Sequence, residues 1–125
     1  MKARVLIADD ASFMRQMIRE IIEPEGYEVV GEATDGVEAV EQYEELHPDL
    51  VTMDIVMPKR SGIDAVKGIL EKTPDAQVVM CSALGQETLV MEALQAGAKD
   101  FIVKPFKPDN VLSTLAKVLE KKSEG

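Results

Sequence analysis

Five residues with chemically useful side chains follow, or end, short apolar segments of the sequence. They are Asp9, Asp10, Asp54, Ser82 and Lys104. Carboxylate oxygens are the ligands that Mg²⁺ prefers, and water and phosphate oxygens usually complete its coordination. A carboxylate can also act as a nucleophile and accept a phosphoryl group, while an ammonium and a hydroxyl can bind the phosphoryl oxygens. These residue types predict phosphoryl transfer assisted by a metal ion, provided that the fold brings them together.

Short apolar segments alternate with amphipathic helical patterns along the chain. The apolar segments are rich in Val and Ile and too short for helices, which predicts five strands, at Arg4–Ala8, Tyr27–Glu32, Leu50–Met53, Gln77–Cys81 and Phe101–Val103. One-sided helical patterns lie between them and after the last one. Strands this apolar need helices on both faces, so we expect an α/β fold with a doubly wound, mostly parallel five-stranded sheet.

Several residues mark the expected ends of the helices. Gly36 opens a helical segment that stops before Pro48. Ser61 and Asp64 have the spacing of an N-terminal capping box ahead of the third helix. Gly97 follows the fourth helix, where a glycine favours its end.

The five polar residues are expected to meet at one edge of the sheet, because ligands of such sheets bind outside the carboxyl ends of the strands. Three carboxylates there have no structural reason to gather without a cation, since at about 4 Å and an effective dielectric of about 20 each pair repels by roughly 4 kcal/mol. Simpler interpretations exist for single residues. Asp9 and Asp10 could cap a helix that begins near Ser12, and Lys104 could be a solvated loop lysine. Ser82 could equally well be a helix cap.

Length and charge limit the possible functions. The chain has 125 residues, which predicts a single domain over 1–125. Its formal net charge of −9 opposes binding to nucleic acid or anionic membranes and favours a protein partner. The single cysteine, Cys81, cannot form an internal disulfide, so we expect a monomer in the reducing cytoplasm.

The sequence resembles the response-regulator receiver family over essentially its whole length. The resemblance rests on four motifs in the right order, which are VLIADD at 5–10, MDIVMP at 53–58, CSA at 81–83 and KPF at 104–106. The stretches DASFMR from Asp10 and SALGQ from Ser82 are most similar to chemotaxis members of the family. The resemblance implies a flavodoxin-like fold with strand order 2-1-3-4-5.

The resemblance also implies a role for each acidic residue. Asp54 would accept the phosphoryl group from a histidine kinase. Asp10, Asp54 and the backbone carbonyl of Val56 would bind Mg²⁺ directly, and Asp9 would act mainly through bound water.

Three further residues match positions that sense the phosphoryl group in the family. The Ser82 hydroxyl and the Lys104 ammonium would contact its oxygens, and the Lys104-Pro105 peptide would be cis. Phe101 matches the aromatic switch position, where many members have tyrosine. A switch at Phe101 therefore has no ring hydroxyl and must work by packing.

The implied function is a phosphorylation-dependent switch that binds a flagellar motor switch protein, with a possible phosphatase as another partner. One alternative is a phosphorelay intermediate that passes its phosphoryl group to a histidine phosphotransfer protein. A less favoured alternative is a Mg²⁺-dependent phosphohydrolase with an aspartate nucleophile. That pattern needs a second Asp two residues after Asp54, where this chain has Val56, so no enzymatic turnover of an external substrate is expected.

The fourth helix carries more apolar surface than one core-facing stripe requires. Its apolar residues spread over roughly 220° at 100° per residue. Val90 and Leu94 lie off the main stripe, so they are the candidates to face solvent or a neighbour and to belong to the output surface together with Phe101 and Ser82. The simpler alternative is that this helix packs more deeply than the others.

Overall fold

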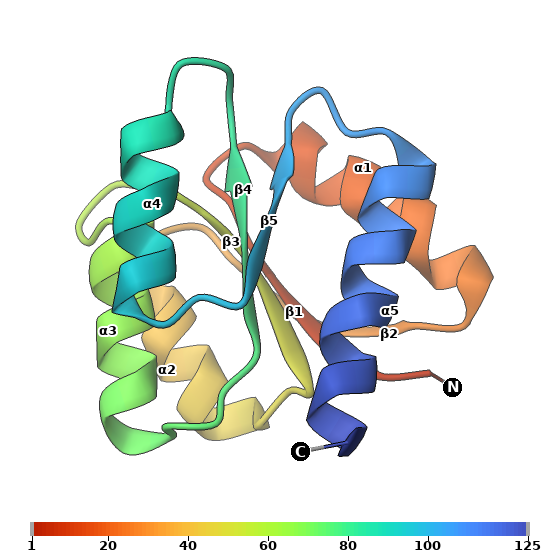
Figure 1. Ribbon diagram of the computed structural model, residues 1–125, viewed down its shortest axis with the longest axis horizontal. Helices are drawn as coiled ribbons and strands as arrows, with labels where there is room; N and C mark the ends of the chain where they lie inside the picture. The colour runs from red at the N-terminus through yellow and green to blue at the C-terminus, as the bar shows by residue number, and fades with distance from the viewer. Residues whose placement is uncertain (1, 125) are drawn as a thin grey trace.

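The computed structural model describes the backbone of residues 2–124 and the side chains of residues 2–121. Strands and helices alternate throughout (Figure 1). The strands are β1 Arg4–Ala8, β2 Glu28–Ala33, β3 Leu50–Asp54, β4 Val78–Ser82 and β5 Asp100–Val103. The helices are α1 Ser12–Ile22, α2 Gly36–Leu46, α3 Gly62–Lys72, α4 Glu87–Ala96 and α5 Pro108–Glu124, with a short 3₁₀ turn, η1, at Glu23–Glu25. The predicted strands are therefore confirmed to within one residue at each end.

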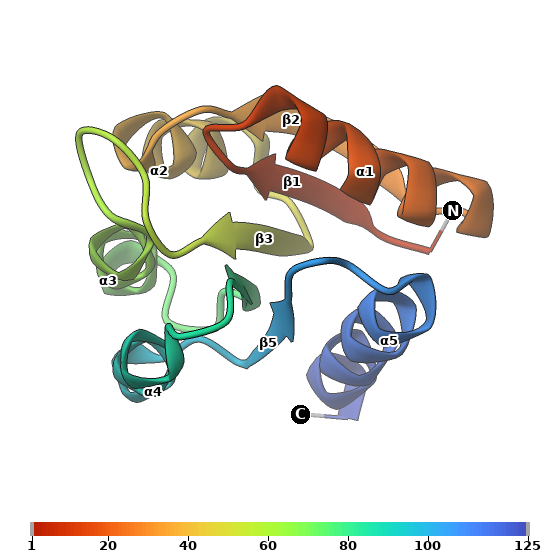
Figure 2. The same ribbon diagram turned by 90° about the horizontal axis from the view of Figure 1, so that it is seen from above.

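The strands form one parallel sheet in the order β2-β1-β3-β4-β5. Helices α1 and α5 cover one face, and α2, α3 and α4 cover the other, as Figures 1 and 2 show from two directions. The doubly wound fold and the strand order are both confirmed. Among the described residues, no helix combines the length and the apolar character that crossing a membrane would need.

Alternate residues of the central strands supply two hydrophobic cores, one on each face of the sheet. Leu6, Val51 and Met80 point toward the α2–α4 side, and their neighbours Ile7 and Val79 point toward α1 and α5. All of these side chains are fully buried. Each one stabilises the fold by about 1.5–3 kcal/mol through burial, so the strands that end in the polar residues are held rigidly.

The expected helix boundaries are present. The Ser61 hydroxyl accepts a hydrogen bond from the Asp64 N–H at 3.2 Å and caps α3. Helix α2 begins at Gly36 and ends at Leu46, before Pro48. Gly97 follows α4 with a φ of 120°, a conformation that glycine adopts without strain.

Helix α4 differs from the prediction for its apolar surface. Val90 is only 6% exposed and belongs to the core, and Leu94 is half-buried. The expectation that Val90 faces solvent is therefore wrong, because α4 packs against both α3 and β4 and buries a wider arc than one stripe. The exposed apolar residue of this helix is Met91.

Candidate functional site

Three carboxylates meet at the carboxyl end of the sheet. The parallel pairing of β1 with β3 places Ala8 opposite Met53, and so brings the following residues, Asp9 and Asp54, side by side. Carboxylate oxygens of Asp9, Asp10 and Asp54 all lie within 4.8 Å of one another. Asp9 and Asp54 are buried, whereas Asp10 is exposed. The cluster is therefore a recess with one side open to solvent.

The two N-terminal aspartates do not cap α1. The residue at the cap position is Ala11, and no side chain accepts a capping hydrogen bond there. Asp9 Oδ1 instead accepts a hydrogen bond from the Ala11 N–H at 2.9 Å, and the Asp9 carbonyl accepts one from Arg15 at 2.6 Å. These contacts fix Asp9 facing the recess, and the capping interpretation is wrong.

Lys104 reaches into the recess from the end of β5. Its Nζ lies 3.0 Å from Asp9 Oδ2 and 3.3 Å from Asp54 Oδ1. Its backbone N–H donates to the Ser82 carbonyl at 2.7 Å, and the following peptide bond to Pro105 is cis, as expected. Burial lowers the pKa of Lys104, but its close contact with Asp9 and the charge of Asp54 outweigh that effect, so the pKa is raised. Lys104 is a charged member of the site and not a solvated loop lysine.

The electrostatic environment of Asp54 is unusual for a carboxylate. Burial and the nearby charge of Asp9 raise its pKa to about 6, while Lys104 opposes the shift. Asp54 Oδ1 accepts a hydrogen bond from the Ile55 N–H at 3.0 Å and also faces Lys104. Among the described residues, the hydrogen bonds and ion pairs of Asp54 all involve Oδ1. Oδ2 is thus left as the oxygen free to act as a nucleophile.

The recess fits a divalent cation of the Mg²⁺ type. Three carboxylates face one ammonium, which leaves an excess of negative charge. Asp9 Oδ2 is buried and, although it is close to Lys104 Nζ, it has no well-aligned hydrogen bond within the described part of the chain. A hard cation bound by oxygen ligands would satisfy both features.

The loop after β3, which carries Val56, is held close to the site by a glycine that sequence reasoning missed. The Gly62 N–H donates to the Ile55 carbonyl at 2.7 Å. A Cβ at position 62 would lie 1.9 Å from the Asp54 carbonyl oxygen, so a larger residue would displace the loop. The sequence signal for this close approach is a glycine at the first position of the helix, directly after the Ser61 cap.

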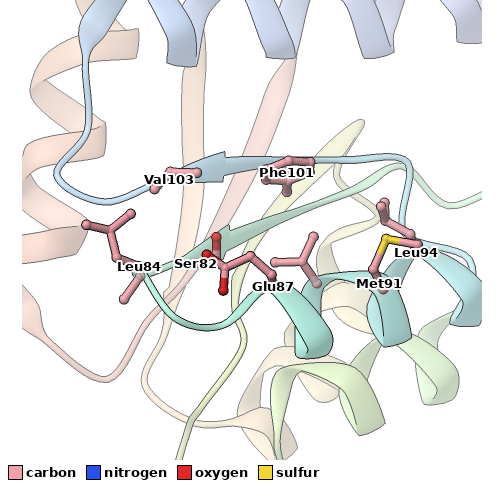
Figure 3. Close-up of a pocket in the computed structure, with 9 residues that line it drawn as sticks. Ser82, Leu84, Glu87, Met91, Leu94, Phe101 and Val103 are labelled. Atoms are coloured by element: carbon pink, nitrogen blue, oxygen red, sulfur yellow. The ribbon is translucent and has the colours of Figure 1, made fainter.

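Ser82 links the recess to a groove beside it. It is the last residue of β4, next to Cys81, which pairs with Asp54 in the sheet. Helix α4 begins after Gln86, so Ser82 is not a helix cap. Ser82 lines a groove of about 250 Å³ between α4 and β5 (Figure 3).

The groove is mostly apolar. Figure 3 shows Phe101 and Val103 on β5 facing Leu84, Met91 and Leu94 across it. Leu84 is 81% exposed, Met91 57% and Phe101 39%, which is high for side chains of this type. Val90 and Leu94 also line the groove, Val90 as a buried residue and Leu94 as a half-buried one. The structure thus brings the predicted switch residues Ser82, Phe101, Val90 and Leu94 together around one groove.

The profile of the response regulator receiver domain family matches residues 5–116. The chain belongs to this family. Over 118 residues the receiver is 60% identical to the chemotaxis protein CheY of Thermotoga maritima, covering 94% of this chain and 98% of that one. Over 119 residues it is 56% identical to the chemotaxis protein CheY of Bacillus subtilis, covering 95% and 99%.

A solved structure supports the same assignment. The crystal structure of the CheX-CheY-BeF₃-Mg²⁺ complex from Borrelia burgdorferi contains a chain that matches this receiver with a TM-score of 0.88 and 43% identity, covering 92% of this chain and 87% of that chain. The receiver is therefore a CheY-like response regulator of two-component signalling in chemotaxis.

Proposed function

We propose that this receiver accepts a phosphoryl group on Asp54 from a histidine kinase and then binds a flagellar motor switch protein. The observation that carries the proposal is the meeting of Asp54 with Asp9, Asp10 and Lys104 in one recess. The contacts of Asp54 support it as the reacting residue, because Oδ1 is held by Ile55 and Lys104 while Oδ2 has no such contact among the described residues.

In the proposed step, the ionised Asp54 carboxylate attacks the phosphorus of a phosphohistidine. A new O–P bond forms as the N–P bond breaks, and the histidine nitrogen keeps the electron pair and takes up a proton from solvent. Lys104 pairs with a phosphoryl oxygen as its contact with Asp54 is replaced. Asp9, Asp10, Asp54 and the Val56 carbonyl would hold Mg²⁺, which offsets the charge of the phosphoryl oxygens.

Phosphorylation would be read out through Ser82 and Phe101. The Ser82 hydroxyl would bind a phosphoryl oxygen and draw the end of β4 toward the recess. Phe101, which is half-exposed at the rim of the groove, would then pack inward. A tenfold gain in partner affinity needs only about 1.4 kcal/mol between the two states. The α4–β5 groove is thus the proposed output surface.

The receiver would act only on its own aspartate. Val56 stands where an aspartate phosphohydrolase has its second acid, so nothing at that position can protonate a leaving group. A protein phosphatase that removes the phosphoryl group from Asp54 is a further proposed partner. The Borrelia relative was solved with CheX, and a partner of that kind is a candidate for this chain.

The second candidate, a phosphorelay intermediate, uses the same chemistry at Asp54, and labelled phosphate distinguishes the two. A chemotaxis kinase carrying ³²P would be mixed with the receiver, with Asp54→Asn as the control. The phosphorylated receiver would then be offered a histidine phosphotransfer protein or a motor switch protein. We expect label on wild type only, and tighter motor switch binding after phosphorylation. Onward transfer of the label without such binding would favour the phosphorelay and contradict the proposal.

A further inference from the structure

Arg15, on α1, contacts the backbone of the site from outside the recess. Its Nη1 donates a hydrogen bond to the Asp9 carbonyl at 2.6 Å, and its Nε donates one to Glu32 Oε1 at 2.8 Å. The Arg15 side chain is only 13% exposed. Figure 2 shows α1 running alongside β1, which leads into Asp9, and β2, which carries Glu32. The guanidinium therefore joins the backbone at the end of β1 to the neighbouring strand.

The hydrogen bond to the Asp9 carbonyl bears on both aspartates of the turn. A peptide unit is planar, so the direction of the Asp9 carbonyl sets the direction in which the chain continues to Asp10. The Asp9 N–H donates to the Ala33 carbonyl at 3.0 Å, so Asp9 is also held from its other side. Among the described residues, the Asp10 carboxylate makes no hydrogen bond or ion pair. Asp10 is therefore oriented by its backbone, and the preceding peptide is the one that Arg15 holds.

Arg19, one turn further along α1, makes only part of the same arrangement. Its Nη2 pairs with Glu32 Oε2 at 2.7 Å and its Nη1 with Glu23 at 2.9 Å. Hydrogen bonds from Arg19 and Arg15 hold the pKa of Glu32 below its usual value, so this carboxylate stays ionised between them. Both arginines thus tie α1 to the edge strand β2. Of the two, Arg15 is the one whose described contacts extend to Asp9.

We propose that Arg15 is a positioning residue for the metal site, and that it holds Asp9 and Asp10 in the arrangement that binds Mg²⁺. The inference rests on the proposed function, because it takes these carboxylates to be the ligands of the cation. A guanidinium suits this task because its donors point in fixed directions, so one side chain can hold a carbonyl and a carboxylate together. Groups that orient metal ligands typically change metal affinity by about 10- to 100-fold.

The positive charge of Arg15 separates positioning from simpler explanations. A guanidinium beside the recess repels a divalent cation, so by Coulomb's law alone its removal would strengthen Mg²⁺ binding. A purely structural tie between α1 and β2 would leave the Mg²⁺ affinity of the folded protein unchanged. Positioning predicts the opposite sign, because carboxylates that are no longer held in place bind the cation less well. Weaker Mg²⁺ binding without Arg15 is therefore the distinguishing result.

The test is a calorimetric titration of MgCl₂ into the full chain, without a phosphoryl donor. Arg15→Gln should weaken Mg²⁺ binding at least tenfold. Arg19→Gln is the matched control, because it removes the same charge from α1 and an ion pair with the same Glu32. It should change the Mg²⁺ affinity less than threefold. Unchanged or tighter binding in Arg15→Gln, or equal losses in the two variants, would overturn the proposal.

Arg15→Lys guards against a loss of binding that only reports unfolding. It keeps the charge and most of the packing, so its circular dichroism spectrum should match that of the wild type. A single ammonium lacks the two diverging donors that reach the Asp9 carbonyl and Glu32, so Mg²⁺ binding should still weaken at least threefold. In NMR spectra the Asp10 amide should shift in both Arg15 variants and not in Arg19→Gln. Wild-type Mg²⁺ affinity in Arg15→Lys would contradict the proposal.

Phosphorylation by acetyl phosphate gives a second readout. Arg15→Gln should raise the Mg²⁺ concentration for half-maximal phosphorylation at least tenfold, while the rate at saturating Mg²⁺ returns to within about threefold of the wild type. The two proposals fail in different ways. A wild type that binds no Mg²⁺ would contradict the proposed function and this inference with it. A wild type that binds Mg²⁺ no more tightly than Arg15→Gln does would contradict only the role of Arg15.

Discussion

At the scale of single residues, Asp54 combines reactivity with a cost in stability. Its folded pKa of about 6 lies above the usual value of about 3.9. Between these values the folded state binds more protons than the unfolded state, so stability falls as the pH rises from about 4 to about 6. The carboxylate that must be ionised to react is therefore held in a place that disfavours its ionised form.

A substitution at Asp54 tests this balance. Asp54→Asn should raise the free energy of unfolding by about 1–3 kcal/mol at pH 7 and change it little at pH 4. Chemical denaturation of both proteins from pH 4 to pH 7, without metal, gives the difference. Glu41→Gln on the exposed side of α2 is the control. A gain at pH 4 as large as that at pH 7 would disprove the electrostatic explanation.

Thr52 is a second residue whose surroundings do not suit its side chain. It is fully buried in β3, and its hydroxyl has no hydrogen-bond partner among the described residues. Thr52→Val keeps the shape and removes the unpaired group, so it should stabilise the protein by about 1 kcal/mol. Thermal and denaturant unfolding would measure this. Thr34→Val is the control. The Thr34 hydroxyl donates a hydrogen bond to Glu38 at 3.3 Å, so its removal should not raise the stability.

The residues of the site could be predicted because each one follows or ends a strand. Their pairings could not. That Lys104 contacts Asp9 more closely than Asp54, and that Gly62 touches the Asp54 backbone, depends on the packing of segments far apart in the sequence. Sequence position identifies which side chains reach the edge of the sheet, but not which atoms meet there.

At the scale of elements, α4 shows why apolar periodicity is ambiguous. A wide apolar arc can mean an exposed output surface or a deeply packed helix, and here it means both. Val90 faces the core, while Met91, one residue later, lies at the rim of the groove. Only the position of α4 relative to α3 and β5 separates the two roles.

This division predicts different outcomes for neighbouring substitutions. Met91→Glu should weaken binding of a motor switch peptide to the beryllofluoride-treated receiver at least fivefold, because it puts a charge in the apolar groove, and should leave unfolding within about 0.5 kcal/mol. Val37→Glu, on exposed α2, should change neither property. Fluorescence titration measures the affinity. Unchanged affinity in Met91→Glu would place the output surface elsewhere.

Val90→Asp is expected to act through the fold instead. The substitution buries an unpaired carboxylate in the core, which typically costs several kcal/mol. Because Val90 also lines the groove, a loss of binding in this variant does not separate unfolding from a lost contact, which makes Met91 the proper probe of the groove.

At the scale of the whole molecule, the fold class follows from the alternation of apolar strands and amphipathic helices. The order β2-β1-β3-β4-β5 does not follow from it, since periodicity says nothing about which strands are neighbours. The order was predicted only through resemblance to the receiver family. It matters for function because it puts β1 beside β3 and so brings Asp9 to Asp54.

Metal binding should be visible in the stability of the whole chain. Mg²⁺ at 100 times its Kd should stabilise the wild type by about 2.7 kcal/mol, because the three carboxylates repel one another without it. Asp10→Ala should be at least as stable without metal and gain much less from Mg²⁺. Asp10 is exposed, so its truncation does not disturb the core. Melting curves with NaCl of equal ionic strength control for screening, and equal Mg²⁺ shifts in both proteins would refute the metal site.

The central claim is that Asp54 accepts a phosphoryl group in the recess at the end of the sheet, and that this reaction requires a divalent cation. Intact-mass spectrometry after incubation with acetyl phosphate tests it most directly, on wild type and Asp54→Asn, each with Mg²⁺ and with a chelator. We predict that the wild type gains the mass of one phosphoryl group with Mg²⁺ and loses that gain with the chelator, and that Asp54→Asn gains none. A phosphoryl adduct on Asp54→Asn, or one on the wild type that forms equally without metal, would contradict it.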